Sequence, residues 1–214
     1  MDSLSILMGW LLGMLSPTIV SNIQKKYTKK ALHKGICTEF DELRYILIFN
    51  CYILGKKAGE FDRKFLQWFI LNAEVYSGDQ GIIDTTLPVV KKLLEEVDDA
   101  ALAAYVKSER EKKSAKSLSL KKINATFTDL NLSELSIFNV DYQSLLFGLK
   151  RLIDNINDET VKVENLCDMT FDSSVSRDNY EIISKNINDK YSQIQSMSIT
   201  LVNKITDFLN FKQY

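Results

Sequence analysis

Histidine and cysteine, residue types that often perform catalysis or bind metals, are few in this sequence. His33 is the only histidine of the chain, which excludes a metal site built from several histidines. Cys37, Cys51 and Cys167 lack the short spacings of metal-binding cysteine pairs. The phosphate-binding patterns G-x-x-x-x-G-K-[S/T] and G-x-G-x-x-G do not occur. We therefore expect no enzyme, no cofactor, no bound metal and no small-molecule substrate.

Carboxylates do occur in pairs, at Glu95–Glu96 and at Asp98–Asp99. Consecutive residues of a helix point in different directions, so these acids are typical of a solvated helix face. A cation held between Glu95 and Asp99, four residues apart, is the less favoured alternative. Three cysteines with no pairing pattern suit a reducing compartment better than a disulfide framework.

The composition favours a helical globular chain. Of its 214 residues, 45% are hydrophobic and 26% are charged, which is ordinary for a folded protein. There are two prolines and eight glycines, so turn-forming residues are scarce and an all-α fold is the simplest prediction. The net charge of −1 argues against a nucleic-acid-binding protein.

An apolar segment at residues 4–23 is the strongest functional signal. No charged residue occurs between Asp2 and Lys25, and about 20 helical residues match a hydrocarbon core of about 30 Å. Five lysines follow it, and under the positive-inside rule they place the N-terminus outside and the body in the cytoplasm: Lys25, Lys26, Lys29, Lys30 and Lys34. A signal peptide fits less well, because it carries positive charge before its apolar run. A buried core helix and a surface amphipathic segment remain alternatives.

Two features qualify this predicted transmembrane helix. Gly9 and Gly13 form a G-x-x-x-G spacing, which provides a flat strip for close packing with another membrane helix; a chance spacing is the alternative. Pro17 should bend the helix or start a new segment. The lysines that follow the helix are expected to contact the membrane surface.

Apolar residues at helical spacing predict the remaining elements. A helix from Ala31 carries the stripe Ile36, Phe40, Leu43, Leu47, Cys51 and Leu54, and a helix after Gly55–Gly59 carries Phe61, Phe65, Trp68, Phe69 and Tyr76. These two should pair as an antiparallel hairpin, with a glycine providing a left-handed cap between them. A third helix is predicted from a cap at Asp84 to residue 106, with alanines that suggest close packing.

The second half of the chain is predicted to contain a linker and two longer helices. Residues 107–122 are interpreted as a fraying helix end, a solvated linker or a second basic strip. A fourth helix is predicted from a cap at Asp141 to residues 155–158, followed by an acidic irregular segment at 160–176. The last helix, from Ser176 or Asp178, has the most regular stripe, which includes Ile183, Ile187, Tyr191, Ile194, Leu201 and Ile205. This stripe predicts a bundle core or, alternatively, a coiled coil with a second copy or partner.

The sequence thus predicts an all-α protein with a single transmembrane helix, a cytoplasmic hairpin and a helical bundle. The expected units are residues 1–24, 25–76 and 77–214. The favoured function is a membrane-anchored scaffold that tethers a protein partner or forms a homo-oligomer, for example as a subunit of a bacterial machine. The alternatives are an oligomeric, membrane-perturbing effector assembled through the N-terminal helix and a transmembrane sensor subunit.

Overall fold

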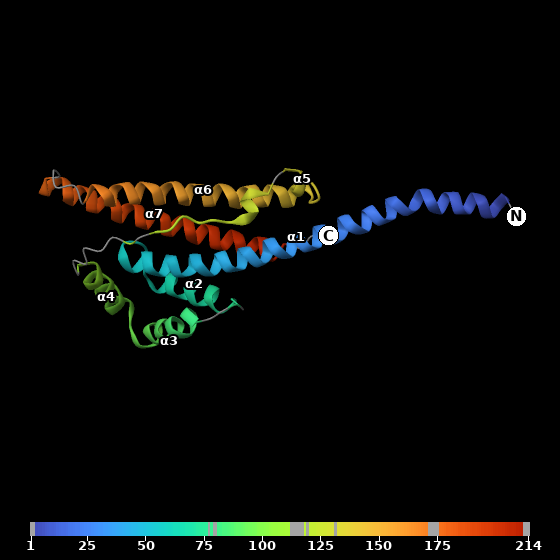
Figure 1. Cartoon of the computed structure of the whole chain (residues 1–214). Coiled ribbons are helices and arrows are strands. Elements are labelled where there is room, and N and C mark those ends of the chain that lie inside the picture. Colours follow the sequence, from blue (N-terminus) through green and yellow to red (C-terminus); the bar gives the residue numbers. More distant parts are fainter. Residues whose placement is uncertain are drawn as a thin grey trace.

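A single helix, α1 (Ser3–Lys57), begins outside the helical body and then runs along it (Figure 1). This computed structural model describes residues 3–76, 78, 81–111, 118, 120–130, 132–170 and 176–211; the side chains of residues 3–16, 82, 111, 128, 132, 177 and 178 lie outside that description. The 55 residues of α1 span about 80 Å at 1.5 Å each. α1 runs unbroken past residue 24 and through Pro17, so the alternative that Pro17 starts a new segment is wrong.

The described residues form six further α-helices and one short 3-10 helix. They are α2 (Arg63–Ala73), α3 (Gly81–Glu96), α4 (Asp99–Glu111), η1 (Thr126–Asp129), α5 (Leu132–Leu135), α6 (Val140–Met169) and α7 (Arg177–Leu209). No β-strand occurs in these described ranges, so the prediction of an all-α bundle is confirmed.

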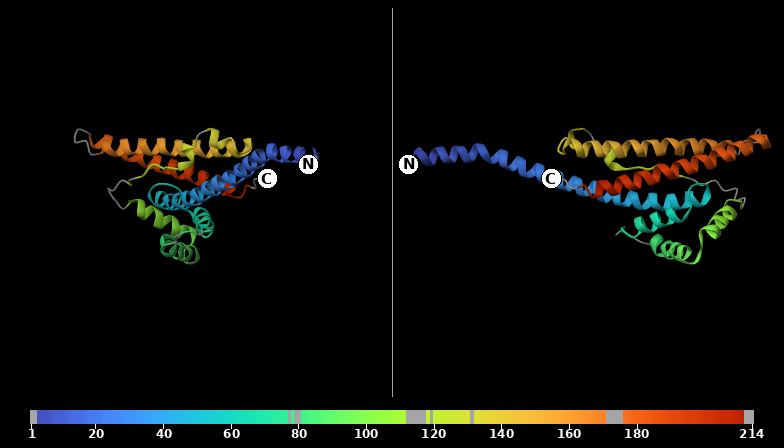
Figure 2. Two further views of the ribbon diagram at one scale, coloured as in Figure 1. Left: turned by 45° about the vertical axis from the view of Figure 1, so that its right-hand side comes forward. Right: turned by 180° about the vertical axis from the view of Figure 1, so that it is seen from behind.

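α7 is the central element of the body, because both α1 and α6 pack along its length. α1 and α7 are antiparallel, as shown by the contacts of Cys51 with Gln195 and of Phe40 with Phe208. The helices α2, α3 and α4 lie on the opposite side of the body from α6 (Figures 1 and 2). The predicted core stripe of α1 is confirmed, since all of its members are buried: Ile36, Phe40, Leu43, Leu47, Cys51 and Leu54.

α2 returns along α1 as the predicted antiparallel hairpin, and aromatic rings join the two helices. The Tyr45 and Tyr76 rings stack with centroids 4.2 Å apart, and the Phe49 and Phe69 rings meet edge to face at 5.6 Å. Asp62 caps α2 by accepting a hydrogen bond from the Phe65 amide at 2.7 Å. The prediction of a left-handed glycine cap is wrong, because no described glycine has a positive φ.

The predicted third helix is two helices, α3 and α4, broken at Val97–Asp98. The Arg63 guanidinium donates to the carbonyl oxygens of Leu94 (2.8 Å) and Val97 (2.5 Å), which satisfies the C-terminal end of α3. Asp98 then caps α4 by accepting from the Ala101 amide at 2.7 Å. α3 also begins at Gly81 rather than at a cap on Asp84.

The alanines of α4 do not pack closely against a neighbour as predicted, because Ala101 and Ala104 are exposed. The residues of α4 that reach the core are instead Leu102 and Val106, both buried. This difference follows from the break between α3 and α4, which changes the direction of the second helix and therefore the face that it buries.

α6 continues about three turns beyond its predicted end, so residues 160–169 are helical and not irregular. The buried side chains of Ile156, Thr160 and Val163 extend its core face. The Glu159 carboxylate, also buried, bonds Lys190 of α7 at 2.6 Å and Lys162 at 2.6 Å. The cap of α6 is Asn139 rather than Asp141, because the Asn139 side chain accepts from the Tyr142 amide. Ser176 caps α7, one of the two caps predicted.

Residues 120–130, here named the crossing segment, connect the long helices. The Asn157 side chain of α6 accepts from the Ile123 amide at 2.7 Å and donates to the Ile123 carbonyl at 2.9 Å. The Glu39 carboxylate of α1 accepts hydrogen bonds from Thr126 and from the Phe127 amide. The crossing segment is therefore held by α6 and α1 together, on the two sides of α7.

Within the described part of the chain, no helix has both the length and the apolar character needed to cross a membrane. Most of the predicted transmembrane segment consists of residues 4–16, whose side chains lie outside the description.

Candidate functional site

The first part of α1 extends well beyond the other helices (Figure 2). Every side chain from Pro17 to Thr28 is exposed, and four of them are large and apolar. Their exposed fractions are 53% for Ile19, 49% for Val20, 49% for Ile23 and 71% for Tyr27. A group of apolar side chains that the body leaves exposed is typical of a surface that contacts a membrane or another protein.

The predicted membrane-surface lysines lie where α1 leaves the body. Lys25, Lys26, Lys30 and Lys34 are exposed. Lys29 is half-buried, and its Nζ lies 5.9 Å from the centroid of the Phe138 ring, which is a cation–π contact. The lysines therefore form a positively charged group at the base of the projecting helix. The predicted packing residues, Gly9 and Gly13, belong to the part of α1 whose side chains the structure does not describe.

The six stripe residues of the last helix are all buried within the chain: Ile183, Ile187, Tyr191, Ile194, Leu201 and Ile205. Two helices of the same chain, α1 and α6, pack along α7. The bundle-core alternative accounts for this burial. A coiled coil with a second copy would need the same side chains to leave the core. The predicted role of these six residues in partner binding stays a prediction.

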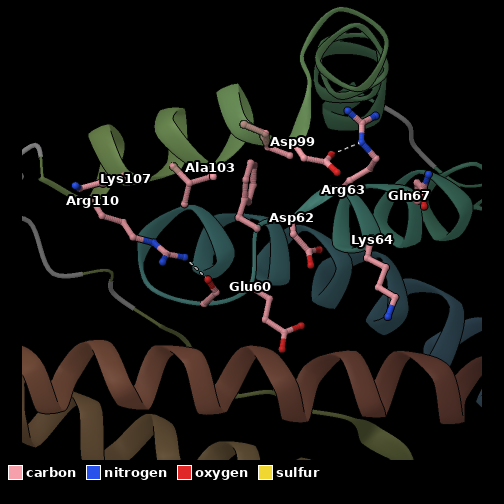
Figure 3. Close-up of a pocket in the computed structure, with 13 residues that line it drawn as sticks. Glu60, Asp62, Arg63, Lys64, Gln67, Asp99, Ala103, Lys107 and Arg110 are labelled. Carbon is pink, nitrogen blue, oxygen red and sulfur yellow. Dashed lines mark hydrogen bonds and ion pairs between the residues drawn. The ribbon is translucent and has the colours of Figure 1, made fainter.

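A groove of about 860 Å³ lies between the start of α2 and one face of α4 (Figure 3). Its apolar lining comes from Phe61, Leu102 and Val106, which are buried. This groove was not predicted, because it depends on the break between α3 and α4 that turns α4 toward α2.

The polar side chains at the ends of the groove are engaged in helix-to-helix contacts. At one end, Arg63 Nε donates to Asp99 Oδ1 at 2.6 Å. At the other end, the Arg110 guanidinium donates to the carbonyl oxygens of Gly59 and of Gly55, the latter at 3.3 Å. These contacts satisfy carbonyl groups at the end of α1 and join α4 to the hairpin. The side chains at the ends of the groove therefore serve to hold α4 against the hairpin.

The histidine of the chain takes part in a small cluster at the base of the projecting helix. His33 Nδ1 lies 2.8 Å from the Tyr142 hydroxyl, and the Cys37 thiol lies 3.6 Å from the same nitrogen. Desolvation and the charge of Lys29 lower the pKa of His33. Burial raises the pKa of the Cys37 thiol, which opposes formation of a reactive thiolate. The cluster thus joins α1 to the start of α6.

The polar residues that hold the fold together and were missed by the sequence-based prediction include Glu39, Asn157 and Gln195. Gln195 had a usable signal, because it lies four residues after Tyr191 and therefore on the buried face of α7. Glu39 and Asn157 had none, since their partners lie in an irregular segment. Among the described residues, no group of three His, Cys, Asp or Glu side chains is placed to hold a metal ion.

A scan against protein-family models, a search of curated proteins and a search of solved structures each found no match to this chain.

Proposed function

We propose that this protein is a membrane-tethered interaction protein whose helical body assembles a protein partner at the cytoplasmic face. The observation that carries the proposal is the projecting part of α1, which combines a continuous helix with an uncharged sequence over residues 3–24. Its described apolar side chains, such as Ile19 and Ile23, contact water in the isolated chain. Hydrocarbon would remove them from water, and the following lysines favour the cytoplasmic side.

An acidic surface on the second half of α6 supports the partner-binding part of the proposal. Asp154, Asp158, Glu164 and Asp168 are all exposed. α6 runs away from the end of the body where α1 projects, so this surface lies toward the end of the body that is far from the proposed membrane (Figure 1). A partner with a basic surface would fit it, and an anionic bilayer would not.

The tether is tested by placing charge in the uncharged segment of the full chain. We expect the double variant Leu12→Asp, Ile19→Asp to leave the membrane fraction, because an Asp at the centre of a span, where Leu12 lies, costs about 2.5–3.5 kcal/mol, and the second Asp adds a smaller cost. The unmodified chain should stay in that fraction through high-salt and carbonate washing. Ile182→Asp is the matched control, since Ile182 is 58% exposed and Ile19 is 53% exposed. Release of the unmodified chain by carbonate would overturn the proposal.

The alternative function, a membrane-perturbing oligomer, is favoured by the Gly9-x-x-x-Gly13 spacing alone. It requires the N-terminal helices of several copies to pack together in the bilayer. Replacing both glycines with Ile should then abolish leakage of a vesicle-entrapped dye. If the unmodified chain binds vesicles without dye leakage, the result contradicts the membrane-perturbing oligomer and is consistent with the tether.

A further inference from the structure

The end of the body from which α1 projects is formed by three other segments. α5, the start of α6 and the end of α7 all reach this end (Figures 1 and 2). Two contacts show which residues of α1 lie beside this end of the body: Lys29 lies over the Phe138 ring, and His33 bonds Tyr142. The segment 136–141 therefore lies beside residues 29–33 of α1.

This level can be compared with the dimensions of a bilayer. Five residues of helix separate residue 24, the last of the uncharged segment, from Lys29, which is a rise of about 7.5 Å. The polar layer on each side of a bilayer is about 5–8 Å deep, from the difference between its full thickness and its hydrocarbon core. A body tethered by residues 3–24 would thus carry Phe138, beside Lys29, at the level of the lipid headgroups, and Tyr142, beside His33, about 6 Å further from the bilayer.

The side chains at this level have the composition of a membrane-interface surface. Val140 is 78% exposed and Tyr27 is 71% exposed, and tyrosine is enriched at membrane interfaces. The exposed lysines at this end are Lys25, Lys26, Lys30 and Lys34. The exposed acids of this end and the adjoining segments are Asp129, Glu134, Asp141 and Asp207. With the exposed Lys204 of α7 the lysines number five, so positive charge is in slight excess and favours anionic lipid.

We propose that this end of the body, made of segment 136–141 with Tyr27 and the adjacent lysines, docks on an anionic bilayer surface. The docking surface rests on the proposed tether and extends it: α1 holds the protein in the membrane, and the docking surface fixes the body against it. Val140 enters the headgroup region while the lysines contact anionic headgroups.

The test places an environment-sensitive fluorophore at the docking surface of the full-length protein. Val140→Cys is labelled with a nitrobenzoxadiazole dye in a Cys37→Ser, Cys167→Ser background, which leaves only Cys51, a fully buried thiol. Ile182→Cys is the matched control, because Ile182 is 58% exposed and lies near the start of α7, at the other end of the body. Flotation with vesicles measures binding separately, and circular dichroism checks that each variant is folded.

With vesicles of phosphatidylcholine and phosphatidylserine, we expect the emission at position 140 to shift to shorter wavelength and grow brighter, with no change at position 182. Replacing Lys25, Lys26 and Lys30 with Gln should reduce the shift at position 140.

Flotation without any emission shift at position 140 would overturn the docking surface and leave the tether unaffected. Failure to float would overturn both. An equal shift with phosphatidylcholine alone would overturn the role of anionic lipid, and a shift without vesicles would assign the surface to protein contact.

Discussion

At the scale of single residues, Gln195 joins three parts of the chain through one side-chain amide. Its Oε1 accepts from the Glu60 amide at 2.6 Å, and its Nε2 donates to the carbonyls of Glu60 (2.7 Å) and Cys51 (3.2 Å). The turn after α1 comes so close that a Cβ atom at Gly55 would lie 2.5 Å from the Glu60 carbonyl oxygen. Glycine is needed here for this close approach, and Gln195 holds the turn against α7.

Replacing Gln195 with Ala should lower the free energy of unfolding by about 2–4 kcal/mol, because it leaves polar groups unbonded and opens a cavity. Gln193→Ala, on an exposed position of the same helix, should change it by less than about 0.5 kcal/mol. Urea denaturation followed by circular dichroism measures both values. Equal losses in the two variants would contradict this role of Gln195.

His33 should make the stability of the protein depend on pH. Because the folded chain lowers the pKa of His33, the unfolded chain binds the proton more readily, and stability falls as the pH drops below about 6.5. The melting temperature should therefore fall between about pH 7.5 and about pH 5.5. His33→Gln, which cannot take up a proton there, should show a smaller fall. Parallel curves for the two proteins would contradict the prediction.

At the scale of elements, the crossing segment has almost no secondary structure of its own, yet α6 and α1 both hold it through Asn157 and Glu39. Two residues before the segment, the Tyr191 hydroxyl of α7 bonds the backbone of Leu118. Burial raises the pKa of this hydroxyl to about 12, so it stays protonated and able to donate. The segment therefore acts as part of the core and not as a loose linker.

Asn157→Ala should release the middle of the crossing segment and lower the free energy of unfolding by about 1–3 kcal/mol, since both Ile123 backbone groups lose their partner. Hydrogen exchange at the Ile123 amide should become faster than in the unmodified chain. Asn155→Ala, on an exposed position of α6, provides the control and should leave both measurements unchanged. If the Ile123 amide of Asn157→Ala exchanges as slowly as in the unmodified chain, Asn157 does not hold the crossing segment.

At the scale of the whole molecule, the chain consists of a helical body and one helix that extends out of it. The body has one continuous core in which α7 contacts both α1 and α6. That core includes residues from both predicted units, 25–76 and 77–214, so α1 packs with the bundle along most of its length inside the body. The projecting part of α1 carries the apolar side chains that this core does not use.

Burial of the α7 stripe within one chain predicts how its variants behave. Leu201→Ala should lower the free energy of unfolding by about 2–5 kcal/mol at any protein concentration, because Leu201 is fully buried between elements of the same chain. Ile53→Ala is the control, at a position that is 46% exposed. Denaturant titrations at several protein concentrations distinguish the alternatives. A loss that shrinks as the concentration rises would favour the coiled coil with a second copy.

What could be predicted from the sequence was whatever repeats locally along the chain. Spacings of three and four residues identified the core faces of α1 and α7, and a serine before the last helix marked its start. These patterns are local, because a helix turns once in 3.6 residues and buries one side of itself. The same local pattern extended the predicted third helix past Val97, because Ala101, Ala104 and Tyr105 continue the stripe at helical spacing.

Only the tertiary structure decided where helices break, how far they continue and which polar groups bond one another. The break between α3 and α4 depends on Arg63, and the extension of α6 is joined to α7 through Glu159 and Lys190. Gln195 and Glu60 are 135 residues apart, and Thr126 and Glu39 are 87 apart. Sequence spacing carries no information on such contacts, because the packing of whole helices brings the partners together.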